Sequence, residues 1–243
     1  MHTLDRRVMK KIDFIPSSKE VEDFVDPPLT AKLLTPEWYR KTSPFKEKDV
    51  EISEDGVLKN TSLKMCMPFF DAMSGGYIQK TWTDIFVKKD GEGNFLEIYY
   101  SFSPKIVVVR DSPNIAINKD VFYDKEFVWQ EPWSPKLPKG YSILYTQPLN
   151  RVDLPFTCLS AIIDADNYYH TSFGQYPFYI NKDFEGLIPA GTPMYQMIPF
   201  KRESWTSGCL EFDATTNERN TRTMKNKFWG TYKQNFWQKK NFS

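Results

Sequence analysis

Prolines recur along the first 200 residues and separate short runs of aromatic and aliphatic side chains. The 243 residues include 17 Pro, and Phe, Tyr and Trp together make up 16% of them. Proline interrupts helices, whereas rings and branched aliphatic side chains favour strands. Strand-like runs about a dozen residues apart, with Pro and Gly between them, are typical of β-sandwiches and barrels. We therefore expect a mainly β protein.

The strand pattern is clearest in six segments. Residues 75–87 alternate apolar and polar side chains, and a Gly-containing turn at 90–94 connects them to 95–100, which predicts a hairpin. The other predicted strands have Pro or Gly near their ends, and they are 139–146, 156–163, 178–180 and 193–200.

Helices are expected in three segments. Residues 36–41 begin with Pro followed by Glu, which is typical of a first helical turn, and the apolar segment 66–73 forms a short helix or a buried turn. Residues 217–240 lack Pro, and their rings recur at helical offsets, which predicts a C-terminal helix interrupted near Gly230. These rings are Phe228, Trp229, Tyr232, Phe236 and Trp237.

These patterns predict one main domain, sandwich-like or of a related β type, with an appendage at each end. We expect an N-terminal arm with a short helix at 1–50, the main β domain at 51–212 and an aromatic, basic helix at 213–243. The basic face of that helix either meets solvent or contacts nucleic acid. Short isolated helices are marginal in water, so we expect its rings to dock, at a subunit contact if the chain is a homo-oligomer.

Composition excludes several classes of function. The formal net charge is only +1, and no apolar run approaches the roughly 20 residues of a membrane-spanning helix. We therefore expect no membrane contact and a cytoplasmic location, or a place in a virion. Cys66, Cys158 and Cys209 show no C-x-x-C spacing, and His2 and His170 are the only histidines, so we expect no metal and no cofactor.

Three segments, 147–151, 160–166 and 188–196, follow one another in an order and spacing that can build a pocket. Asp164 and Asp166 end a predicted strand two residues apart and so share one face, where they either hold a sugar hydroxyl or a metal, or cap a turn. Arg151 either binds an anion through its planar guanidinium or pairs with Asp153 or Asp166.

Two further polar residues have two interpretations each. His170 is either a general base near the aspartates or an ordinary exposed or ring-packed side chain. Gln196 interrupts an apolar strand, and a buried amide must form hydrogen bonds, either to backbone or to a ligand.

The same segments resemble the dUTP nucleotidohydrolase and dCTP deaminase family. Residues 162–166 are similar to its strand that presents an Asp to the sugar and a Tyr for stacking, and residues 191–196 are similar to its Gly-x-x-x-x-Gln strand. Residues 148–151 stand where that family has its phosphate-binding turn, but the Ser-Gly of that turn is absent. The resemblance implies a β-clip fold, and the missing Ser-Gly turn favours a site without catalytic residues. We expect a ligand pocket formed by Asn150, Arg151, Asp164, Asp166, Tyr168, His170 and Gln196.

A second resemblance covers more of the chain. Residues 66–77, 140–151 and 199–205 are similar to an uncharacterised family found in tailed phages of marine bacteria and in some bacterial gene clusters. Two hypotheses follow. The chain is a phage-encoded, non-catalytic binding or assembly protein with a pocket for a small polar, nucleotide-like ligand. Alternatively, it is a degenerate or divergent nucleotide-processing enzyme.

Overall fold

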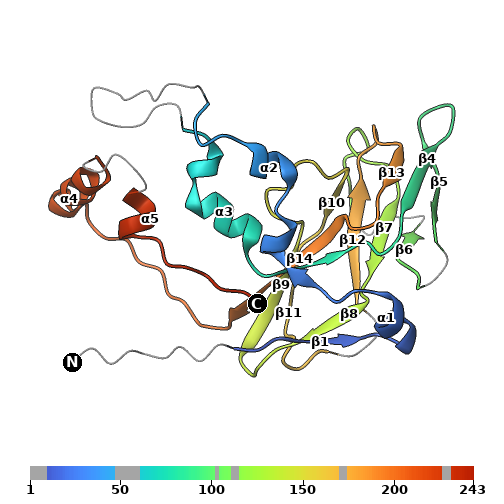
Figure 1. The fold of residues 1–243 in the computed structure, drawn as a ribbon, viewed down its shortest axis with the longest axis horizontal. Coiled ribbons are helices and arrows are strands. Elements are labelled where there is room, and N and C mark those ends of the chain that lie inside the picture. Colours follow the sequence, from blue (N-terminus) through green and yellow to red (C-terminus); the bar gives the residue numbers. More distant parts are fainter. Residues whose placement is uncertain (1–9, 47–60, 102–103, 111–114, 170–173, 226–230) are drawn as a thin grey trace. The chain divides into compact units, whose positions relative to one another are not determined.

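A computed structural model of the chain describes residues 10–46, 61–101, 104–110, 115–169, 174–225 and 231–243 (Figure 1). Of these residues, 33% lie in strands and 21% in helices, so the prediction of a mainly β fold with a C-terminal helix is confirmed. The chain divides into two compact units. The first comprises Met1–Leu29 and Gly76–Arg202, and the second comprises Thr30–Gly75 and Glu203–Ser243.

The first unit holds the larger sheets. Five strands follow the order β11 (Ala161–Ile163), β9 (Tyr141–Thr146), β14 (Pro193–Lys201), β3 (Tyr77–Lys80) and β2 (Leu29–Thr30). Four strands follow the order β10 (Phe156–Cys158), β12 (Gln175–Ile180), β7 (Glu126–Gln130) and β6 (Val107–Arg110). A three-stranded sheet contains β13 (Gly186–Ile188), β4 (Ile85–Lys89) and β5 (Phe95–Tyr100).

The N-terminal segment adds a small sheet to this unit. Strand β1 (Asp13–Pro16) pairs antiparallel with β8 (Trp133–Lys136), and helix α1 (Lys19–Phe24) follows β1. Ser18 caps this helix, since its Oγ accepts a hydrogen bond from the Val21 N–H at 3.2 Å. Prolines within β1 and β8 are tolerated because a two-stranded ladder has two free edges.

The predicted hairpin is confirmed, because β4 and β5 pair antiparallel with Phe86 opposite Tyr99. Two of the predicted strands are each divided between two sheets. Residues 75–87, the first strand of the predicted hairpin, contain β3 and the start of β4, and residues 156–163 contain β10 and β11. In the first case Thr81 leaves the ladder. Its N–H donates to the Thr192 carbonyl at 2.8 Å and its hydroxyl donates to the Pro189 carbonyl at 2.9 Å.

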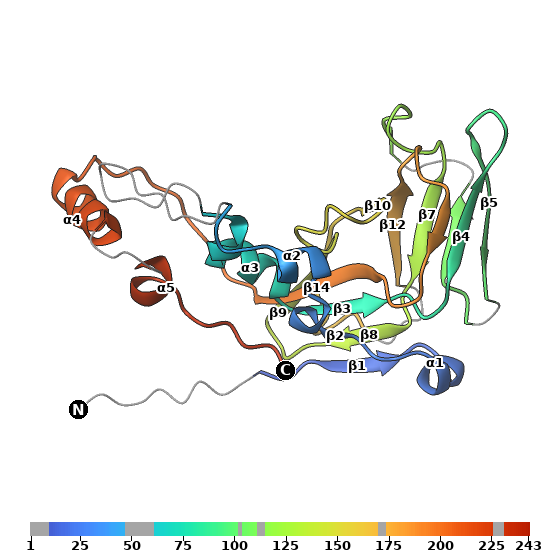
Figure 2. The same cartoon turned by 45° about the horizontal axis from the view of Figure 1, so that its top comes forward.

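Aromatic rings form the core of this unit. Trp129 stacks on Phe178 with ring centroids 3.9 Å apart, and Phe156 meets Trp129 edge-on at 5.4 Å. The three-stranded sheet packs against the four-stranded sheet (Figure 2). Phe95 and Phe127 meet there with their ring centroids 5.0 Å apart. These contacts account for the high aromatic content of the sequence.

One carboxylate lies among the rings of this unit. Glu131 Oε1 accepts hydrogen bonds from the hydroxyls of Tyr145 at 2.6 Å and Tyr176 at 3.0 Å, and its Oε2 accepts one from Ser134 at 2.9 Å. The three donors come from β9, β12 and β8, so this carboxylate connects three sheets. Burial raises the pKa of Glu131, while the three hydrogen bonds act in the opposite direction.

The second unit contains the remaining helices: η1 (Ala31–Leu34), α2 (Glu37–Lys41), η2 (Leu63–Met65), α3 (Met67–Ser74), α4 (Ala214–Lys225) and α5 (Thr231–Asn235). The helices expected at 36–41 and 66–73 are present as α2 and α3. Tyr39 of α2 is buried and lies 5.9 and 6.0 Å from the rings of Phe69 and Phe70 in α3. The expected interruption at Gly230 lies outside the described residues.

Within the described residues, no helix has both the length and the apolar character needed to cross a membrane.

Candidate functional site

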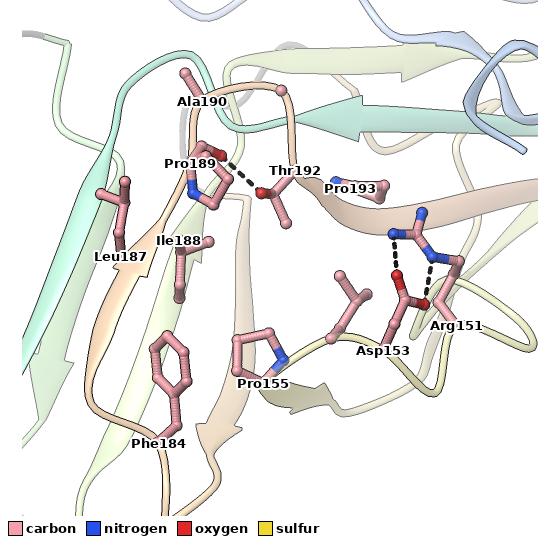
Figure 3. Close-up of a pocket in the computed structure, with 12 residues that line it drawn as sticks. Arg151, Asp153, Pro155, Phe184, Leu187, Ile188, Pro189, Ala190, Thr192 and Pro193 are labelled. Atoms are coloured by element: carbon pink, nitrogen blue, oxygen red, sulfur yellow. Dashed lines mark hydrogen bonds and ion pairs between the residues drawn. The ribbon is translucent and has the colours of Figure 1, made fainter. Parts of the chain in front are cut away.

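A pocket of about 540 Å³ opens beside the turn that follows β9 and the loop that joins β13 to β14 (Figure 3). Polar and apolar surface line it in nearly equal parts, and the apolar lining residues include Leu154, Pro155, Phe184 and Ile188. The polar lining residues are Arg151, Asp153 and Thr192. A concave apolar surface with a few polar groups is the usual form of a binding site.

Hydrogen bonds hold the β13–β14 loop in place. Thr192 donates its hydroxyl to the Pro189 carbonyl at 2.6 Å, and its N–H bonds to the Thr81 hydroxyl at 3.0 Å. The Ala190 N–H donates to Asp84 Oδ1 at 2.7 Å. Gly191 has a φ of +87°, a left-handed conformation that favours glycine. This wall of the pocket is therefore preformed.

Arg151 pairs with Asp153. This is one of the two roles expected for Arg151 from the sequence, the other being the binding of an anion. Arg151 Nε lies 2.8 Å from Asp153 Oδ1, and Nη2 lies 2.7 Å from Oδ2, so the guanidinium and the carboxylate meet in a bidentate pair (Figure 3). The Arg151 side chain is only 11% exposed. An incoming anion would have to displace Asp153, so this rim suits an uncharged group better than a phosphate.

Gln196 makes a backbone contact. It is fully buried in β14, and its Oε1 accepts a hydrogen bond from the Leu149 N–H at 2.7 Å. The turn before Arg151 also contains Asn150 in the left-handed region, with a φ of 62°. Gln196 therefore helps to fix the turn that carries Arg151.

Asp164 and Asp166 are both held by Arg202. Asp166 accepts hydrogen bonds from both Nη atoms of Arg202 and from the Gly140 N–H at 2.7 Å. Asp164 Oδ1 accepts a hydrogen bond from the Ser142 hydroxyl at 2.6 Å and lies 3.0 Å from Arg202 Nη1. The Arg202 hydrogen bonds, with that from Gly140, lower the pKa of Asp166 to about 2. The Ser142 and Arg202 hydrogen bonds lower the pKa of Asp164.

The three central candidates do not line one pocket. Gln196 lies opposite Thr146 in the β14–β9 ladder, whereas Asp164 bonds to Ser142, four residues along the same strand. At ~3.3 Å per residue these positions are ~13 Å apart. Of the candidates that the structure describes, only Arg151 is among the residues that line the pocket.

Tyr168 is not among the residues that line the pocket. Tyr168 is 51% exposed, and its N–H donates to the Asp164 carbonyl at 2.9 Å. His170 lies outside the described residues. Sequence reasoning did not name Arg202 as the partner of the aspartates, because it is 36 residues from Asp166.

We expect that Arg202→Gln raises the pKa of Asp164 and Asp166 toward ordinary carboxyl values, because it removes the cation that stabilises both charged forms. Since the native pKa of Asp166 lies below its unfolded value, its contribution to stability is lost as pH falls from about 4 toward 2. Carboxyl titration by NMR measures the shift. Unchanged titration of both groups would contradict the assigned contacts.

The segment 203–213 exposes large apolar side chains. It connects β14 to α4 as an extended chain (Figure 1). Every residue in it is exposed. Trp205 is 85% exposed, Leu210 is 97% exposed and Phe212 is 80% exposed. From here on, the arm means residues 203–213, not the N-terminal segment 1–50. Monomeric proteins rarely leave so much apolar surface in one stretch, so the arm is a candidate interface.

The rings near the chain end are only partly docked. Trp237 donates its Nε1–H to Asp71 at 2.8 Å, and Lys240 lies 2.6 Å from the same carboxylate. Tyr232 and Phe236 remain 39% and 46% exposed, and Phe228 and Trp229 lie outside the described residues. In α4, Arg222 lies 3.6 Å from Glu218, so part of the predicted basic face is already paired.

No family model and no curated protein matches this chain. Within the described ranges, no group of three or more His, Cys, Asp or Glu residues is arranged to hold a metal ion. Burial raises the pKa of the Cys158 thiol to about 12, which keeps it protonated and a poor nucleophile.

Proposed function

We propose that this chain is a non-catalytic assembly protein that associates with further copies of itself through the arm. The observation that carries the proposal is the exposure of Trp205, Leu210 and Phe212 in a segment with no buried residue. The similarity of residues 66–77, 140–151 and 199–205 to a phage family supports a phage origin. Its place of action would then be the host cytoplasm or the virion.

The area of the arm is sufficient for a stable contact. A docked aromatic side chain buries roughly 150–250 Å². Each arm carries two rings, Trp205 and Phe212. Two arms exchanged between two copies would therefore bury four rings, roughly 800 Å² in all, and a similar area on the receiving faces. The resulting total of roughly 1,600 Å² is the standard size of a specific protein interface.

Helix α4 supports the same proposal. It is a polar helix of 12 residues, and most of its described side chains are exposed. Isolated helices of this length are marginal in water, so α4 gains stability when the arm beside it is held by a partner. Asp213 caps its start by accepting the Thr216 N–H at 2.9 Å, which ties the end of the arm to the helix.

We expect that the triple variant Trp205→Ser, Leu210→Ser, Phe212→Ser lowers the mass measured by light scattering to that of the 28.6 kDa monomer. The wild-type chain should show a multiple of that mass. A matched control replaces three exposed apolar residues elsewhere, Phe24, Leu33 and Ile162, with Ser. A wild-type chain that is monomeric at high concentration, or a control that dissociates equally, would contradict the proposal.

A second candidate is binding of a small polar ligand in the pocket beside Arg151, favoured by its preformed loop and its volume of about 540 Å³. Nucleotides, with and without magnesium, are the probes for a thermal-shift test. A nucleotide-processing activity is less well supported, because Asp164, the residue similar to the family's sugar-binding Asp, is engaged with Ser142 and Arg202. Pyrophosphate or ammonia release that is abolished by Asp164→Asn would favour the enzyme instead.

A further inference from the structure

The outer face of the three-stranded sheet carries an apolar row. Leu187 of β13 lies opposite Phe86 of β4, which lies opposite Tyr99 of β5. These side chains are 51%, 42% and 48% exposed, whereas Ile85 and Val87, the neighbours of Phe86 in β4, are fully buried. The solvent-facing side of an antiparallel sheet is normally polar, so this row is unusual.

The row is continuous with the pocket. Leu187 starts the row and is also one of the residues that line the pocket, where it lies at the edge, on the other side of β13 from Pro193 (Figure 3). Neighbouring strands lie ~4.8 Å apart, so the row extends ~10 Å from Leu187 to Tyr99. Together the pocket and the row form one apolar track, and we call it the receiving face.

The arm has matching dimensions. In an extended chain, Leu210 and Phe212 point to the same side because they are two residues apart. Trp205 lies five residues before Leu210, which is ~17 Å along an extended chain. Five is an odd offset, so Trp205 would face away from Leu210 in a straight extended chain. Gly208 lies between them and permits a bend that turns Trp205 to the same side, within reach of the pocket.

The pocket also has the chemistry for an indole ring. Its volume of about 540 Å³ accommodates a single Trp side chain, and its mixed polar and apolar lining suits an indole, which has an apolar ring and one N–H donor. The guanidinium of Arg151 lies at the polar rim, fixed by Asp153, where it can meet the face of a ring in a cation–π contact. The paired rim has little net charge, which suits an uncharged ring.

We infer that the arm of one copy docks on the receiving face of a second copy, with Trp205 in the pocket and Leu210 and Phe212 over Phe86 and Tyr99. This inference rests on the proposed self-assembly and adds the surface that receives the arm. It accounts for two exposed apolar features of the chain with one contact.

The test uses two single-site variants, both in a Cys209→Ser background that removes the exposed native thiol. One chain carries Leu210→Cys and the other carries Phe86→Cys. After the two are mixed and oxidised, a disulfide between them can form only in trans. The control partner carries Phe24→Cys, an exposed position outside the receiving face. Circular dichroism melts establish that each variant is folded.

We expect a disulfide-linked heterodimer of the Leu210→Cys and Phe86→Cys chains at least fivefold above the Phe24→Cys control, with the linked peptides identified by mass spectrometry. If light scattering shows an oligomer but the link does not exceed the control, the receiving face is wrong while self-assembly stands. A monomer in light scattering overturns both proposals. A Leu187→Ser, Phe86→Ser variant that keeps the wild-type mass also overturns the receiving face.

Discussion

Gly76→Ala should lower the free energy of unfolding by about 4 kcal/mol, the combined cost of overpacking and of a left-handed backbone for alanine. Gly76 has a φ of +68°, and an added Cβ would lie 2.1 Å from the Met197 carbonyl oxygen. That oxygen belongs to β14, the strand that pairs with β3, so the clash is with backbone that the sheet holds in place.

Gly140→Ala is the matched control for this prediction. Gly140 also has a positive φ, +85°, but no heavy atom lies within 4 Å of an added Cβ. Its replacement should cost only the conformational term, about 1 kcal/mol. Urea denaturation of both variants measures the difference. Equal losses would mean that the close approach of residue 76 to β14 does not matter.

Glu131→Leu should destabilise the protein by about 4 kcal/mol, because it leaves buried hydroxyls without their acceptor, each at a cost of roughly 1–3 kcal/mol. The hydroxyls are those of Tyr145, Tyr176 and Ser134. Glu131→Gln is the isosteric control. It keeps Oε1 as the acceptor for both tyrosines, and the Ser134 hydroxyl can accept from the new amide.

The same pair of variants predicts a pH dependence. Burial raises the pKa of Glu131 above its ordinary value of 4.5, so the folded state holds a proton that the unfolded state releases. The stability of the wild-type chain should therefore fall as pH rises from about 4.5 through the raised pKa. Denaturation of Glu131→Gln should lack that fall. Parallel stability curves for the two proteins would contradict the assigned pKa direction.

Local patterns were predictable from the sequence. The Pro-Glu start of α2, the turn between β4 and β5 and the apolar segment of α3 each depend on residues close together in the chain. Strands β7 and β8 were not predicted, because Pro132 and Pro135 interrupt residues 126–136. The chain also changes sheets between β10 and β11 within an apparently continuous apolar run, which periodicity alone does not reveal.

The candidate site was predictable only in part. The pairing of Arg151 with Asp153 is local and was one of the alternatives drawn from the sequence. The contact of Arg202 with Asp166 and the hydrogen bond from Leu149 to Gln196 depend on tertiary structure, so spacing along the chain does not indicate them. Exposure of the arm was also invisible, because Trp205, Leu210 and Phe212 would be expected in a core.

In the proposed assembly, the arm is covered by another copy of the chain. Amide hydrogen exchange of residues 203–213, measured across a hundredfold range of protein concentration, tests it most directly. The arm has no helix or strand of its own, so in a monomer its amides should exchange rapidly. We predict that protection of these amides appears as concentration rises and disappears in the Trp205→Ser, Leu210→Ser, Phe212→Ser variant. Rapid exchange of the wild-type arm at every concentration would contradict self-assembly through the arm.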